Sequence, residues 1–364
     1  MKKTLLALTG ILTVFLLLLA LVTCGDKGTD PPPPNTNPEG VLYVLNQNDS
    51  TMYIYDSHTL ARIDSIRTGV PANPHHMEFD PQHEYAYVIG RTSPGQIARF
   101  HLHDNEFESL ITAPFAIFPT SMVTSGDGAT GYVCDFSIVS GGGRIHRINL
   151  STMAFTDSIY QSGSQTHDIK ATTNRDILVA ANYQTDNVTI IYLNGDSVTF
   201  VDCEPGGNNP STTNEGPYGI AIDHNDSLVY IFCRLSRKIR VMDLAARTIV
   251  DSISVPGSST ADLYGPSLGV INAANTKLYV TSQKDNLVHI INLTNRTVIK
   301  SIPTGATQPF GITFSDGEAR LYVSCVNAGG LGHIYLIDPT TDNIVDSIIA
   351  GHGTYMSHQH AGHH

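Results

Sequence analysis

Short apolar runs separated by polar turns recur along the chain from residue 41 onward. The clearest set comprises residues 278–282, 287–292, 297–302 and 309–312, and four-residue turns join the first run to the second and the second to the third. Apolar runs of this length between turn-forming residues are typical of β-strands. The 31 Gly and 19 Pro residues argue against long helices. The pattern therefore predicts a unit of four consecutive strands.

This unit is repeated with a period of roughly 45 residues, which is typical of β-propellers. Its first strand recurs seven times, at residues 42–44, 86–88, 131–133, 177–179, 229–231, 278–280 and 321–323. An Asp-Ser-Ile triplet closes the unit at Asp64, Asp157, Asp251 and Asp346. We predict an all-β fold, a seven-bladed β-propeller of four-stranded blades.

The two ends of the repeat region predict how the ring closes. Counted from the propeller axis, the strand that begins at residue 41 is the second strand of a blade, so its innermost strand is missing at the N-terminus. Residues 355–364 fall where an innermost strand is due. We therefore expect the C-terminal strand to complete the first blade. A closed ring leaves no sheet edge that needs a partner, so we expect a monomer.

Three short motifs of the repeat resemble the YVTN family of propellers, similar to the bacterial periplasmic YncE type. They are Tyr279-Val280-Thr281, Ile337-Asp338 and Pro309-Phe310-Gly311-Ile312, in the last of which Phe310 replaces a usual His. The resemblance covers residues 41–364 and implies the propeller fold. It implies no single activity, because propellers host binding proteins, lyases, lactonases and oxidoreductases.

The N-terminus predicts export. Lys2 and Lys3 precede an uncharged apolar stretch at residues 5–22, and the Leu21-Val22-Thr23-Cys24 sequence resembles a lipobox. We divide the chain into a lipoprotein signal peptide (1–23), a Pro-rich spacer (24–40) and the propeller (41–364). We expect a lipid on Cys24 and a location in the bacterial cell envelope, either periplasmic or surface-exposed. An uncleaved membrane anchor remains the alternative.

The charge of the chain restricts its partners. There are 33 acidic and 21 basic residues, which give a formal net charge of −12. Such a charge opposes broad contact with phosphate backbones, so nucleic acid is excluded as a partner. An unidentified protein or small molecule is expected instead.

The innermost strands of a propeller surround its axis, so one residue from each blade lines the central channel. Aligning the repeats assigns these positions to His75, Thr120, His167, Tyr218, Leu268, Phe310 and His358. Imidazole is a ligand for copper and zinc. Cu or Zn at the channel mouth is therefore one prediction, with the ligands His75, His76, His167, His358 and His360. The other interpretation is structural, with these side chains hydrogen-bonding backbone between blades.

The cysteines of the repeats predict buried thiols rather than a disulfide framework. Cys134, Cys233 and Cys325 fall on or just after corresponding strands of different blades, which are too far apart for a disulfide. A bridge between Cys203 and Cys233, in neighbouring blades, stays open.

Three functional hypotheses follow. The preferred one is a lipid-anchored binding module with Cu or Zn at the channel mouth, indicated by the lipobox, the seven repeats and the ring positions of His75, His167 and His358. The chain has no Gly-x-Ser-x-Gly elbow, His-Glu-x-x-His helix or phosphate loop. The second is a lyase or lactonase type of propeller enzyme that uses His167 as a general base, with a metal or Tyr218 polarising the substrate. The third is a purely protein-binding scaffold. In each, the long connections at 206–216 and 256–265 help to shape a binding mouth.

Overall fold

The computed structural model describes residues 40–67, 73–113, 118–137, 143–160, 163–204, 215–257, 265–305, 308–327 and 329–360. The chain divides into two units, Met1–Asn37 and Pro38–His364. The first unit lies wholly outside the described residues, and so do Cys24 and most of the expected spacer. The signal peptide and the lipid anchor therefore remain predictions.

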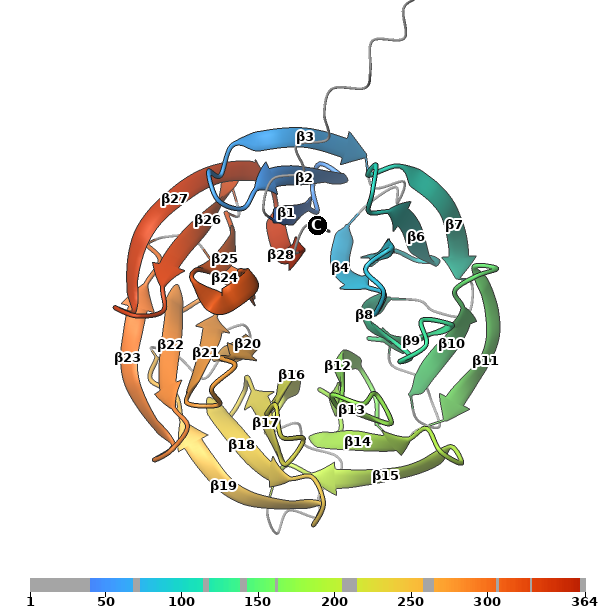
Figure 1. The fold of residues 1–364 in the computed structure, drawn as a ribbon. Coiled ribbons are helices and arrows are strands. Elements are labelled where there is room, and N and C mark those ends of the chain that lie inside the picture. Colours follow the sequence, from blue (N-terminus) through green and yellow to red (C-terminus); the bar gives the residue numbers. More distant parts are fainter. Residues whose placement is uncertain are drawn as a thin grey trace, which may run out of the picture. The chain divides into compact units, whose positions relative to one another are not determined.

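Seven four-stranded antiparallel sheets form a ring in the second unit (Figure 1), which confirms the predicted seven-bladed β-propeller. Blade 1 consists of β28 (Thr354–His360), β1 (Val41–Asn46), β2 (Thr51–Asp56) and β3 (Arg62–Arg67), from the axis outward. Blade 2 consists of β4 (Pro74–Phe79), β5 (Tyr85–Gly90), β6 (Gly95–His101) and β7 (Phe107–Ala113). Blade 3 consists of β8 (Pro119–Thr124), β9 (Thr130–Asp135), β10 (Arg144–Asn149) and β11 (Ala154–Tyr160). Blade 4 consists of β12 (Thr166–Ala171), β13 (Ile177–Asn182), β14 (Asn187–Tyr192) and β15 (Ser197–Asp202).

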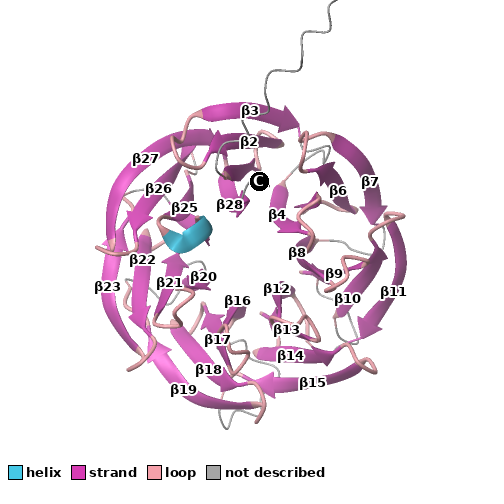
Figure 2. Ribbon diagram, in the orientation of Figure 1, coloured by secondary structure: helices cyan, strands magenta, loops and turns pink. Residues whose placement is uncertain are grey.

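The remaining blades repeat this order. Blade 5 consists of β16 (Pro217–Ile222), β17 (Leu228–Cys233), β18 (Lys238–Asp243) and β19 (Thr248–Ser254). Blade 6 consists of β20 (Pro266–Ile271), β21 (Lys277–Ser282), β22 (Leu287–Asn292) and β23 (Thr297–Pro303). Blade 7 consists of β24 (Gln308–Phe314), β25 (Leu321–Val326), β26 (Leu331–Asp338) and β27 (Asn343–His352). In the described part of the chain the one helical piece is a 3₁₀ turn, η1 (Asp316–Glu318), shown in cyan in Figure 2. No helix in that part is long and apolar enough to span a membrane.

Burial follows the position of a strand within its blade. The second strands β5, β9, β13, β17 and β21 each end in five consecutive buried residues, because neighbouring blades cover both faces of the sheet. The outermost strand β3 is exposed along almost its whole length. The continuous apolar runs in the sequence therefore mark second strands.

The C-terminal strand closes the ring as predicted. β28 pairs with β1 in antiparallel register, from Val41 opposite His360 to Asn46 opposite Thr354. Asn46 Oδ1 accepts hydrogen bonds from Gly351 N at 3.1 Å and from Thr354 Oγ1 at 2.9 Å. Gly353, between them, has a φ of 68°, a backbone conformation that favours glycine. These contacts fix the turn that directs β28 into blade 1.

Candidate functional site

Five side chains from innermost strands fill the centre of the ring, and we call this group the aromatic plug. Its members are His75, His167, Tyr218, Phe310 and Tyr355, none of them more than 8% exposed. The ring centroids are 3.4 Å apart for His167 and Tyr218, 3.8 Å for Phe310 and Tyr355, and 4.6 Å for His75 and Tyr355. The plug closes the channel at this level.

A chain of hydrogen bonds fixes the proton positions on the two histidines of the plug. His167 Nδ1 lies 3.1 Å from the carbonyl oxygen of Tyr218, so Nδ1 carries the proton and donates. Its Nε2 is then an acceptor, and it lies 3.4 Å from His75 Nε2, which must therefore donate. His75 Nδ1 is left as an acceptor for the Gln47 amide nitrogen, 2.9 Å away. Every ring nitrogen of the pair is engaged.

Burial keeps both imidazoles neutral. It lowers the pKa of His75 well below 6.5, and the charge of Arg91 lowers this pKa further. Burial likewise lowers the pKa of His167, with smaller contributions from His75, Arg91 and Arg234. The Arg234 guanidinium lies 4.0 Å from the centroid of the Tyr218 ring. Two arginines therefore bring positive charge close to a plug that carries none.

The other expected channel residues lie beside the plug. Thr120 Oγ1 donates to the Thr166 carbonyl at 3.1 Å, and Leu268 belongs to the same apolar cluster as Tyr218 and Phe310. Thr120 and Leu268 also border a void of about 10 Å³, which is close to the smallest space that holds one water molecule.

His358 does not occupy the expected position next to His75. Its ring lies 5.6 Å from that of His76 and 5.8 Å from that of Phe79, and Tyr355 contributes to the plug instead. The innermost strand of every blade pairs irregularly with its neighbour at one position, and the unpaired residue there is His75 in β4, His167 in β12 and Tyr218 in β16. In β28 the unpaired residue is Tyr355, which is therefore the true equivalent of these residues. The predicted position in β28 was therefore three residues too far along the chain. His360 ends β28, and its side chain lies outside the described part.

The expected metal ligands fall into two separate pairs, His75 with His167 and His76 with His358. The buried Nε2 atoms of His76 and His358 have no hydrogen-bond partner among the described residues. Within the same residues, no group of three or more His, Cys, Asp or Glu side chains is arranged to hold a metal ion. Copper or zinc binding therefore remains a prediction, and the second pair is its best candidate.

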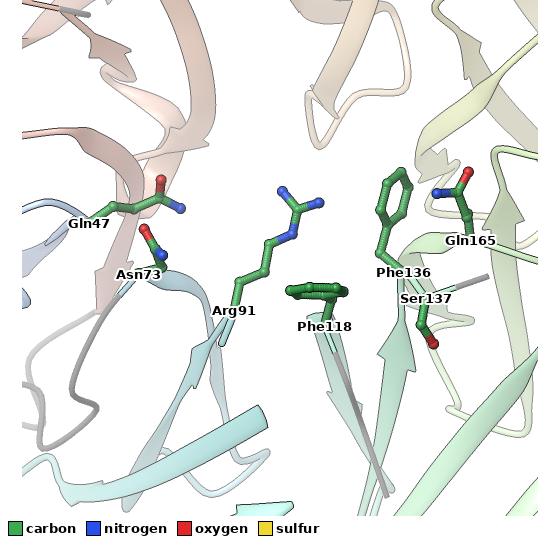
Figure 3. Close-up of a pocket in the computed structure, with 7 residues that line it drawn as sticks. All are labelled: Gln47, Asn73, Arg91, Phe118, Phe136, Ser137 and Gln165. Atoms are coloured by element: carbon green, nitrogen blue, oxygen red, sulfur yellow. The ribbon is translucent and has the colours of Figure 1, made fainter. Parts of the chain in front are cut away.

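A cavity of about 640 Å³ lies next to the plug (Figure 3). Phe136 connects the two, because it lines the cavity and its ring centroid is 5.7 Å from that of His167. Gln47 also belongs to both, through its hydrogen bond to His75. The described residues that line this mouth cavity are Gln47, Asn73, Arg91, Phe118, Phe136, Ser137 and Gln165.

Backbone hydrogen bonds hold the walls of the mouth cavity. The Asp135 carboxylate, at the end of β9, accepts from Phe118 N at 2.9 Å and from Ser137 N at 3.0 Å. On the opposite wall Arg91 N donates to Asn73 O at 2.9 Å. Gln47 N donates to Gly353 O at 2.9 Å, so the C-terminal segment also positions the cavity.

Arg91 gives the mouth cavity its charge. Figure 3 shows its guanidinium group in the middle of the cavity, between Gln47 and Phe136. The group lies 5.1 Å from the centroid of the Phe136 ring. It forms no ion pair with any described Asp or Glu side chain. An uncompensated guanidinium beside an apolar ring is suited to binding an anion.

Three of the cavity residues occupy a repeated position in the sequence, although they belong to no motif. The residue directly after the second strand of each blade lies at the same end of the ring. These positions are Gln47, Arg91, Phe136, Tyr183, Arg234, Gln283 and Asn327. Three of them line the mouth cavity, and Arg234 covers the plug.

Residues 152–348 match the model of the family described as "Lactonase, 7-bladed beta-propeller". The match spans more than half of the chain. The chain belongs to this family. No curated protein sequence matches it significantly.

Solved structures similar to this lactonase-family chain share the fold at low sequence identity. A dihydro-heme d1 dehydrogenase, NirN, is 11% identical with a TM-score of 0.62, over 89% of this chain and 75% of that chain. A protein of unknown function from Desulfotomaculum acetoxidans is 10% identical with a TM-score of 0.68, over 88% and 98% of the two chains. The propeller domain of Cps50 (Swd1) from Myceliophteria thermophila is 10% identical with a TM-score of 0.64, over 81% and 91%.

The family match and the mouth cavity cover different parts of this lactonase-family propeller. The match begins at residue 152, whereas Gln165 is the one described cavity residue that follows this position. His167 and Tyr218 of the plug lie within the match. The ligand of the cavity must therefore be inferred from the cavity's own chemistry.

Proposed function

We propose that this chain binds a small organic anion with a hydroxyl group, a hydroxy acid, in the mouth cavity. The observation that carries the proposal is the Arg91 guanidinium inside the cavity, without a carboxylate partner among the described side chains. Its planar set of N–H donors matches the two oxygens of a carboxylate.

The hydrogen-bond chain of the plug specifies a second feature of the ligand. Because the Gln47 nitrogen donates to His75, the Gln47 carbonyl oxygen is left to accept. Gln47 lines the cavity, so a ligand hydroxyl is a suitable donor. Phe118, which is 42% exposed, and Phe136 offer apolar surface for the carbon skeleton.

The net charge of −12 requires the attraction to be local. A negative protein repels anions at long range, so Arg91 must act by contact rather than by steering. We expect binding to depend on this one side chain.

Lactone hydrolysis is the second candidate, favoured by the family of the chain. Water adds to a lactone to give a hydroxy acid, so the proposed ligand is the product of that reaction. Arg91 would stabilise the negative oxygen that forms during the addition. The lone pair of His167 Nε2 is taken up by His75, so His167 is not available as a general base in this arrangement.

The lipid anchor at Cys24 and the cell-envelope location complete the proposal, supported by Lys2, Lys3 and the apolar stretch that follows. Binding of Cu or Zn by His76 and His358 is a separate proposal, supported by their two unpartnered nitrogens.

Calorimetric titration of the full chain with aldonates, with D-gluconate as the reference, tests the proposed function. We expect Arg91→Ala to weaken binding roughly 10- to 100-fold, the value of a charge-assisted hydrogen-bond pair. Arg144→Ala is the matched control, because Arg144 lies against Tyr160 on the outer strand β11, away from the cavity. Incubation with the corresponding lactones, with acid release measured in a pH-stat, distinguishes turnover from binding.

Two results would overturn the proposal. One is the absence of binding for every aldonate. The other is binding that Arg91→Ala and Arg144→Ala affect equally.

A further inference from the structure

Two buried cysteines lie at the interface between blades 4 and 5. Cys203 follows β15 of blade 4 and Cys233 ends β17 of blade 5. Both side chains are 0% exposed and belong to one apolar cluster formed by the two blades. Burial raises the pKa of the Cys233 thiol, and the neighbouring Cys203 side chain raises it further.

The backbone holds both residues in place. Cys203 N donates to Asp186 O at 2.8 Å. Cys233 lies between two strands, opposite Pro217 in β16 and Lys238 in β18. A disulfide requires two side chains whose sulfur atoms approach one another without displacement of the backbone. These hydrogen bonds hold both backbones at the interface that buries the two thiols.

The other two described cysteines lack this arrangement. Cys134 lies in the cluster between blades 3 and 4, and Cys325 in the cluster that includes Phe310. No disulfide is present among the described cysteines. Cys134 and Cys325 therefore serve as internal controls.

We propose that Cys203 and Cys233 form a disulfide that joins blades 4 and 5 when the chain folds in an oxidising compartment. This step rests on the proposed export of the chain, and it is independent of the ligand of the mouth cavity. A protein disulfide or oxidised glutathione supplies the oxidising equivalent. One cysteine, as a thiolate, attacks that disulfide and releases one thiol. The second cysteine then displaces the other thiol, so that the S–S bond forms while the donor is reduced by two electrons and gains two protons.

Burial determines when the exchange takes place. Neither thiol is accessible in the closed ring, so the mixed disulfide must form before blades 4 and 5 pack together. The completed bond is then protected from reductants.

The bond also bears on the plug. Cys233 immediately precedes Arg234, whose guanidinium lies on Tyr218. Restraining Cys233 therefore restrains the residue that covers the plug.

Peptide mapping of the full chain, exported and kept without reductant, tests this proposal. Trypsin cleaves after Arg175 and Arg234, and the peptide between these sites holds Cys203 and Cys233 and no other cysteine. After alkylation in denaturant, we expect this peptide to carry no alkyl group. Its mass should be lower than that of the reduced peptide by two hydrogen atoms. Cys134 and Cys325 should be fully alkylated. Full alkylation of Cys203 and Cys233 in the exported protein would overturn the proposal.

Thermal unfolding supplies a second readout. We expect reduction before unfolding to lower the melting temperature of the exported protein by about 5 °C. This value follows from the entropy of closing the loop between Cys203 and Cys233, divided by the unfolding entropy of the whole propeller. Cys203→Ala should remove this dependence on reductant, whereas Cys134→Ala should retain it. An equal response of both variants would contradict the bridge even if each folds.

Discussion

Acid should destabilise the propeller through the two histidines of the plug. His75 and His167 are neutral in the folded state because burial lowers their pKa values well below 6.5. In the unfolded chain both imidazoles take up a proton near pH 6.5. The unfolded state therefore binds more protons below this pH, and the free energy of unfolding falls as the pH falls. The stabilisation is fully present above pH 6.5.

The size of the effect follows from the number of groups. Each histidine that stays neutral in the folded state lowers the free energy of unfolding by about 1.4 kcal/mol for every pH unit below pH 6.5. When the pH falls from 6.5 to about 5, the two histidines together lower the free energy of unfolding by about 4 kcal/mol. Other buried histidines add to the total, among them His358, whose pKa burial lowers to about 3. The contribution of the pair is therefore best measured as a difference between variants.

Urea unfolding at a series of pH values measures this difference. We expect the double variant with His75→Gln and His167→Asn, which keeps hydrogen-bonding groups at both positions, to show a pH slope smaller by about 2.7 kcal/mol per unit. His103→Gln is the control, because the His103 side chain is exposed. Equal slopes for the wild type and the double variant would refute the assignment of two neutral imidazoles.

Three further predictions concern the plug, the cavity wall and the metal. Phe310→Ala should lower the free energy of unfolding by about 3–5 kcal/mol, because a ring that is 1% exposed leaves a cavity; a loss below about 1 kcal/mol in urea unfolding would show that the plug collapses freely. Asp135→Ala should weaken aldonate binding in calorimetry, because Phe118 N and Ser137 N lose their acceptor; unchanged affinity would mean that this wall does not touch the ligand. Protein loaded with zinc or copper and dialysed against a weak chelator should retain about one ion per chain. The variant with His76→Phe and His358→Phe should retain none, and equal metal contents would remove these two residues as ligands.

The fold was predictable because every blade carries its own signal. Residues 278–280 and their six counterparts are buried apart from the partly exposed Ile177, so the same apolar run appears seven times. The plug was only partly predictable. His75, His167, Tyr218 and Phe310 were assigned correctly. In β28 the equivalent residue is Tyr355, and the prediction of His358 was wrong because it lies three residues after that position.

The repeat spacing indicates where Gln47, Arg91 and Phe136 lie, but it does not predict the contacts that form the mouth cavity. Arg91 and Phe136 follow strands rather than belonging to them, so no alternation of apolar and polar residues marks them. Their importance comes from the contact between Arg91 and the Phe136 ring and from the absence of a described acidic partner. Such contacts between blades are set by the closed ring and not by any one repeat.

The pairing of β28 with β1 has a consequence for biosynthesis. β1 leaves the ribosome before the other six blades, yet β28, the innermost strand with which it pairs, is made after them. Throughout that interval the inner edge of β1 offers unpaired N–H and C=O groups, which can template aggregation. Ring closure is also a contact between segments far apart in the chain, which slows folding. A chain that crosses a membrane before it folds would expose this edge on the far side until β28 arrives.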